Sequence, residues 1–184
     1  DVITLGETML RLTSPGQQLL EQAHNLQIHV GGSESNVAVG LARLGLRVAW
    51  VSRLTDNPLG HLISNTLRSQ GVDVSHVIWT PEDRVGLYFL EQGPAPRGAQ
   101  VLYDRAGSAM SRMQPDELPA HLLTSKQPGW LHLSGITLAL SQTAATTALT
   151  AAQQAKAAGW RISFDVNYRA KLWSYDAAST GCEP

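Results

Sequence analysis

The sequence predicts an α/β fold: a doubly wound, Rossmann-like, mostly parallel sheet accompanied by a small second β-sheet. Short apolar runs alternate with amphipathic stretches from end to end, which is the order of βαβ units. Two further pairs of alternating strands do not fit a parallel sheet, and they indicate a separate layer that covers a site. Hydrophobic residues make up 43% of the 184 residues, so the chain can bury a core.

The first half of the chain carries signals for four strands and two helices. The strands are expected at residues 2–5, 10–12, 26–30 and 47–52, the middle two being half-exposed. A helix is expected over residues 35–44, because Gly45 is a natural helix stop. For the second helix, Asp56 or Asn57 can form the cap, Pro58 suits the first turn, and Gly71 stands just past the end.

The second half continues the alternation and adds a hairpin. The expected elements are a strand at 74–79, hairpin strands at 85–91 and 99–104, a strand at 130–133, a helix at 141–158 and a last strand at 160–165.

Composition and charge exclude several classes of function. The 14 basic and 15 acidic residues give a formal charge of −1, without the clustered basic residues of nucleic-acid-binding proteins. No apolar run reaches the ~18 residues of a membrane span, and the first residues lack the basic region of a signal peptide. One cysteine, Cys182, and six scattered histidines indicate neither a disulfide framework nor a zinc site. We therefore expect a cytoplasmic protein with no nucleic-acid or membrane partner and no metal-ligating residues.

Polar residues gather in four turns that directly follow predicted strands. In open α/β sheets, ligands bind beyond the carboxyl ends of the strands, so these turns form the candidate site. Glycines at 31 and 32 would let the backbone approach a ligand, although an ordinary strand-to-helix turn also explains the pair. Neither a Walker A loop nor the dinucleotide-binding fingerprint occurs. The four turns are Gly6-Glu7, the run from Gly31 to Asn36, Ser134-Gly135 and the run from Asp165 to Arg169.

Two consecutive stretches resemble a known protein family. GGSESNVAVGLARLG at residues 31–45, followed by SRLTDNPLG at residues 52–60, is similar to the first signature of the ribokinase-like (PfkB) sugar kinases. Thr55 stands where that signature usually has glycine, and we expect this change to alter only a turn. The likeness runs from TLGE at residues 4–7 to Leu172-Trp173. Three local features are most similar to the branch that phosphorylates 2-keto-3-deoxygluconate: Gly86-Leu87-Tyr88, Tyr103-Asp104-Arg105 and DVNYR at residues 165–169.

The resemblance implies a ribokinase-like fold with a β-sheet lid, and it implies roles for particular residues. From the lid, Tyr88, Tyr103 and Arg105 would reach the sugar. Arg169 would pair with the substrate carboxylate, and Asn167 would shape the phosphate end of the cleft, where ATP binds. Hydrogen bonds to the sugar hydroxyls would come from Gly32, Ser33, Glu34, Ser35 and Asn36, with a further sugar contact from Glu7.

Each of these side chains also has a plainer alternative. Arg105 could form a surface ion pair with Asp104 or Glu91, which would contribute little to stability. The two tyrosines could simply pack the hairpin, while Asn167 could form a turn and Arg169 could be solvated.

The resemblance also implies a second sequence signature, which does not occur in these 184 residues. Kinases of this family carry a second signature, a Gly-Ala-Gly-Asp turn, whose aspartate is the base and whose amides bind the transferred phosphoryl group. This chain stops before it, so we expect no catalytic residue here and most of the ATP and Mg²⁺ site to be absent. Residues 1–184 would be the N-terminal part of one kinase domain, with lid strands roughly at 10–30 and 84–105. The last residues, AASTGCEP, resemble the family poorly.

The implied function is transfer of the ATP γ-phosphate to the terminal hydroxyl of 2-keto-3-deoxygluconate or a similar sugar acid. The alternatives are a fructokinase- or ribokinase-type kinase of a neutral sugar, a non-catalytic sugar-binding fragment, and a product without function. The strand with Trp160, Ile162 and Phe164 is expected at an edge open to pairing. The resemblance implies a second candidate interface at the lid segment 85–103, because family members often dimerise through their lid sheets. We therefore expect a homo-oligomer, and no phosphate transfer by this chain alone.

Overall fold

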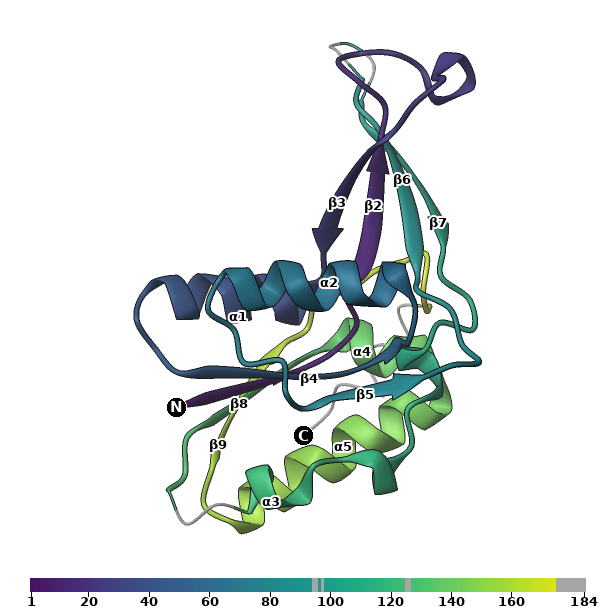
Figure 1. Cartoon of the computed structure of the whole chain (residues 1–184). Coiled ribbons are helices and arrows are strands. Elements are labelled where there is room, and N and C mark those ends of the chain that lie inside the picture. The colour runs from purple at the N-terminus through teal and green to yellow at the C-terminus, as the bar shows by residue number, and fades with distance from the viewer. Residues whose placement is uncertain (94–95, 97, 125–126, 175–184) are drawn as a thin grey trace.

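The computed structural model describes residues 1–93, 96, 98–124 and 127–174, and Cys182 and the run AASTGCEP lie outside them. Its body is a five-stranded sheet in the order β5-β4-β1-β8-β9, with every neighbouring pair parallel (Figure 1). The predicted parallel sheet is confirmed, and among the described strands β9 is outermost, as expected. The strands are β1 (Val2–Leu5), β4 (Val48–Thr55), β5 (Val77–Thr80), β8 (Trp130–Ser134) and β9 (Arg161–Asp165).

Helices cover both faces of this sheet (Figure 1). One face carries α1 (Ser33–Arg43) and α2 (Pro58–Ser69), and the other carries α5 (Gln142–Ala157) with the short α3 (Ala120–Leu123). Another short helix, α4 (Gly135–Leu140), directly follows β8. Short 3₁₀ turns occur at Leu20–Gln22, Met110–Arg112 and Pro115–Glu117. Within the described part of the chain, no helix has both the length and the apolar character needed to cross a membrane.

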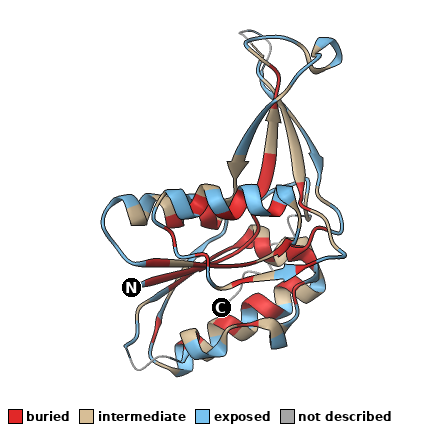
Figure 2. Cartoon of the chain, viewed as in Figure 1, coloured by how far each residue is buried: buried red, intermediate tan, exposed pale blue. Residues whose placement is uncertain are grey.

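Two apolar cores lie on the two faces, because side chains alternate along each strand (Figure 2). On the α2 side, the fully buried Trp50 belongs to one core with Ile63 of the helix. On the other side, Leu131 belongs to the second core with the buried small residues of α5. Those residues recur at helical spacing, and their small size lets the helix approach the sheet closely: Ala148, Ala151 and Ala155.

A second, four-stranded sheet projects from the body as a lid, in the order β3-β2-β6-β7 (Figure 1). The predicted separate β-layer is therefore confirmed. β2 is antiparallel to β3 and parallel to β6, and β6 is antiparallel to β7. At the base of the lid, Arg84 forms an ion pair with Asp104 at 2.7 Å. The lid strands are β2 (Met9–Thr13), β3 (Gln27–Gly31), β6 (Leu87–Glu91) and β7 (Gln100–Asp104).

Two differences from the sequence prediction affect the carboxyl end of the parallel sheet, and each has a local reason. α1 begins at Ser33, two residues earlier than expected, because Gly32 is extended and its carbonyl accepts the first helical hydrogen bond from Asn36 at 3.0 Å. The helix Gly135–Leu140 was not predicted, because six residues are too few to show a helical period. Both differences add residues to the carboxyl end of the parallel sheet, where the candidate site lies.

Candidate functional site

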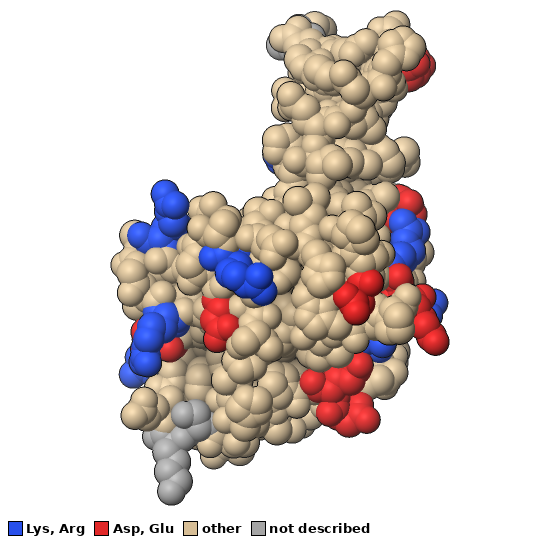
Figure 3. All heavy atoms as spheres, viewed as in Figure 1, with Lys and Arg blue, Asp and Glu red and all other residues tan. Residues whose placement is uncertain are grey.

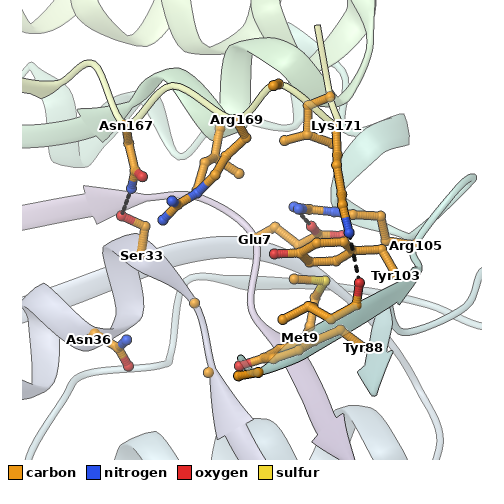
Figure 4. A pocket seen from close by; sticks show the side chains of 17 residues that line it. Glu7, Met9, Ser33, Asn36, Tyr88, Tyr103, Arg105, Asn167, Arg169 and Lys171 are labelled. Carbon is orange, nitrogen blue, oxygen red and sulfur yellow. Dashed lines mark hydrogen bonds and ion pairs between the residues drawn. The ribbon is translucent and has the colours of Figure 1, made fainter. Parts of the chain in front are cut away.

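A cavity of about 720 Å³ lies between the lid and the carboxyl ends of the sheet strands (Figure 4). Its walls come from the turns after β1 and β9, the starts of α1 and α4, and the lid strands. This volume falls within the range of roughly 300–1,000 Å³ that is usual for small-molecule sites. Many of the residues singled out in the sequence line it: Gly32, Ser33, Asn36, Tyr88, Tyr103, Arg105, Asn167 and Arg169.

Two of the predicted sugar-binding residues, Glu34 and Ser35, do not line the cavity. Glu34 is fully buried, and its Oε1 accepts hydrogen bonds from the Ser134 amide at 3.1 Å, the Ser134 hydroxyl at 2.7 Å and the Thr137 hydroxyl at 2.8 Å. Ser35 is 2% exposed. The helical period explains the difference from the prediction, because residues three apart share a face and so only Ser33 and Asn36 reach the cavity.

Two tyrosines form the lid side of the site. Tyr88 and Tyr103 are direct cross-strand partners in β6 and β7, and their ring centroids lie 5.8 Å apart. They therefore pack the hairpin and line the cavity at the same time. Burial raises the pKa of Tyr88, which keeps its phenol protonated and able to donate a hydrogen bond. Gly31 makes room for it, since a Cβ there would stand 2.8 Å from the Tyr88 hydroxyl.

A buried carboxylate fixes Arg105 at the cavity wall. Arg105 forms an ion pair with Glu7, and the Ser108 hydroxyl donates to the other oxygen of the same carboxylate. The side chains of Arg105 and Glu7 are 10% and 3% exposed. The surface pairing of Arg105 with Asp104 is not formed, because Asp104 pairs with Arg84. Pairing with Glu7 compensates the charge of Arg105 and holds it in one orientation.

The turn after β9 forms the body side of the site. Asn167 adopts a left-handed φ of 39°, and its amide donates to Asp165 Oδ1 at 3.0 Å, so it does form a turn. Its Nδ2 also donates to Ser33 Oγ at 2.9 Å, which joins this turn to the start of α1. Arg169 lies beside Asn167 at the cavity, and no side chain in the described ranges pairs with its guanidinium (Figure 4).

Lys171 is a cavity-lining residue that the sequence analysis missed. Its Nζ donates to the Val101 carbonyl at 2.8 Å and lies 5.8 Å from the centroid of the Tyr103 ring. A second basic side chain two residues after Arg169, in the same turn, was the available signal. The apolar part of the lining, such as Met9 and Ile136, carries no polar signal that could have indicated it.

The fold and the cavity together define an α/β protein whose small lid sheet lies over a cavity of the size usual for small-molecule sites. The model of the pfkB carbohydrate kinases matches residues 1–183, and the chain belongs to this family. Its ribokinase-like fold is thereby confirmed.

Curated relatives and solved structures agree with that assignment. The chain is 43% identical over 183 residues to a 2-dehydro-3-deoxygalactonokinase of Haloferax volcanii, covering 100% of this chain and 57% of the relative. It is 36% identical over 179 residues to a 2-dehydro-3-deoxygluconokinase of Thermoproteus tenax, covering 97% and 53%. The 2-dehydro-3-deoxygluconokinase structure from Thermotoga maritima matches with a TM-score of 0.88 and 37% identity, over 94% of this chain and 52% of that one. The chain thus spans about half the length of the relatives that it matches.

Proposed function

We propose that the protein containing this chain phosphorylates a 2-keto-3-deoxy sugar acid, and that this chain supplies the sugar-binding half. The terminal hydroxyl of the acid would receive the γ-phosphate of ATP. The observation that carries the proposal is the Arg169 guanidinium, which lines the cavity without a side-chain partner among the described residues. A guanidinium binds a carboxylate through two charge-assisted hydrogen bonds, which a neutral sugar cannot form.

The remaining cavity residues suit the rest of such a substrate. Ser33 and Asn36 present a hydroxyl and an amide from α1, and Tyr88 and Tyr103 present phenols from the lid. Arg105, held by Glu7, adds a fixed donor beside them. A lid over the cavity would exclude water from the reacting groups.

The phosphate side of the reaction is assigned mainly to residues outside this chain. Asn167, at the carboxyl end of β9, would shape the end of the cavity that faces ATP. The described residues contain no group of three or more His, Cys, Asp or Glu side chains able to hold a metal ion. We therefore assign the Mg²⁺ site, the catalytic aspartate and the amides that bind the phosphoryl group to the part of the relatives' length that this chain does not span.

Ligand binding by the wild-type protein and an Arg169→Ala variant tests the proposal. Calorimetry should show binding of 2-keto-3-deoxygluconate or its galactonate epimer in preference to fructose and ribose. Arg169→Ala should weaken acid binding by about 10- to 100-fold, since charged hydrogen bonds are lost, and should leave neutral sugars unaffected. Arg68→Ala, an exposed position on α2, is the matched control.

The alternatives give different results in the same experiment. Preference for fructose or ribose, with equal effects of Arg169→Ala on every ligand, would identify a kinase of a neutral sugar. We expect the 184-residue chain alone to bind the acid without ATP-dependent phosphorylation, and phosphorylated product in that assay would contradict the division into two halves. Absence of any sugar binding would reject the proposed function.

A further inference from the structure

The segment after β9, residues 166–173, connects the body with the lid, and we call it the strap. Near its start, Asn167 Nδ2 donates to Ser33 Oγ at 2.9 Å, at the N-terminus of α1. Near its end, Lys171 Nζ donates to the Val101 carbonyl of β7 at 2.8 Å. The strap is therefore attached to a helix of the body at one point and to a strand of the lid at another.

Arg169 lies between these two attachment points (Figure 4). Because none of the described side chains pairs with its guanidinium, the strap backbone determines where Arg169 stands. The backbone carbonyl of Arg169 accepts hydrogen bonds from the amides of Leu172 at 2.8 Å and Trp173 at 3.4 Å. These bonds close a turn that contains Lys171. Any change in how the strap is attached would therefore move Arg169.

Lys171 also contacts the aromatic wall of the cavity. Its Nζ and the Cζ of Arg105 each lie 5.8 Å from the centroid of the Tyr103 ring. Arg105 is already fixed by Glu7, which belongs to the body. Two cations therefore contact the Tyr103 ring: Arg105 from the base of the lid and Lys171 from the strap.

We propose that Lys171 is a positioning residue that couples the strap to the lid and so sets the separation of Arg169 from Tyr103. The inference rests on the proposed function, in which these two residues contact the same bound sugar acid. Without the coupling, the strap and lid would have to become ordered when the ligand binds, and this ordering would reduce affinity.

Two variants of Lys171 and one control separate this role from others. Lys171→Met keeps the length of the side chain but removes its charge and donor, whereas Lys171→Arg keeps both. Lys156→Met, at an exposed position in the last turn of α5, is the matched control. Hydrogen exchange of the β7 amides is measured in the intact protein without ligand. Affinities are measured for 2-keto-3-deoxygluconate and for its uncharged amide.

Lys171→Met should speed exchange in β7 and weaken both ligands by a similar factor, about three- to tenfold. Lys171→Arg should keep the exchange rate of β7 and the ligand affinities close to those of the wild type, and Lys156→Met should change neither quantity. Unchanged exchange in β7 would overturn the proposal, and so would a loss confined to the charged acid, which would make Lys171 a direct partner of the carboxylate. Exchange is measured without ligand, so failure of the wild-type protein to bind either compound would count against the proposed function alone.

Discussion

Glu34 is a carboxyl group buried without a cationic partner among the described residues. One of its oxygens accepts three hydrogen bonds from Ser134 and Thr137, and the other finds no hydrogen-bond partner within the described part of the chain. The residue that packs against Glu34, Gly6, must be glycine, because a Cβ there would stand 2.2 Å from the Glu34 carboxyl carbon. Glu34 thus joins the end of β8 and the short helix α4 to the start of α1, and it packs against Gly6, which follows β1.

Glu34→Gln should change how the stability of the protein depends on pH. Burial raises the pKa of Glu34 in the folded state, so the folded protein retains a proton that the unfolded chain releases above its ordinary pKa of 4.5. The free energy of unfolding of the wild type should therefore fall as pH rises from that value to the folded pKa, by at most about 1.4 kcal/mol per pH unit. Glutamine does not titrate, so the variant should lack this slope.

Chemical denaturation at a series of pH values from 4 to 8 measures the effect (~0.5-unit steps resolve it). Glu82→Gln, at an exposed position, is the control and should retain the wild-type slope. Parallel stability curves for wild type and Glu34→Gln would contradict the assignment of a protonated carboxyl to this site.

At the scale of single elements, α2 depends on a cap supplied by Asn57. The side chain of Asn57 accepts hydrogen bonds from the amides of Leu59 at 3.0 Å and Gly60 at 3.1 Å, and Pro58 occupies the first turn. The helix then buries Ile63 and Leu67 against β4 and its neighbours. The cap matters to the whole body because this helix covers one face of the sheet.

Asn57→Ala should destabilise the folded protein by about 1 kcal/mol, because two amides at the helix start lose their acceptor. The midpoint of urea unfolding measures this loss. Asn65→Ala, an exposed position inside the same helix, is the matched control and should have little effect, since alanine is the better helix former. Equal midpoints for the two variants would show that the cap does not stabilise α2.

At the scale of the whole molecule, the lid has an apolar row on the face opposite the cavity. Strand register aligns Ile28 with Leu12, Leu12 with Phe89, and Phe89 with Leu102 across all four lid strands. Ile28 is 52% exposed and Leu102 is 64% exposed. In the view of Figure 3, charged side chains gather on the body, and the projecting lid is largely free of them. This row supports the proposal that the protein forms a homo-oligomer through its lid.

Leu102→Lys should disrupt that association, because it places a charge in the middle of a desolvated contact. Light scattering over a range of concentrations should show dimers of the wild type and at least about a tenfold weaker association of the variant. Gln100→Lys, on the same strand and face but outside the row, is the control. If the wild type shows a monomeric mass at every concentration, both the lid interface and pairing at the β9 edge are rejected.

The sequence by itself determined the alternation of strands and helices, the separate lid layer and the turns that carry polar residues. These features follow from local patterns: apolar periods of two or 3.6 residues, glycine stops and caps. The motifs at residues 31–45 and 52–60 then indicated the family, and the short stretches that contain Tyr88, Tyr103 and Arg169 indicated the branch within it, because these residues occur together and in order. Arg169 was found in this way, as the last residue of the turn after β9.

Only the tertiary structure decided which of these side chains meet. Glu7 pairs with Arg105, 98 residues away, and Lys171 bonds to the strand at Val101, 70 residues away. Glu34 likewise turns from the cavity to Ser134, 100 residues away. Such contacts depend on the order of strands in the sheet and on the rotation of a helix about its axis, and no local pattern in the sequence encodes either one.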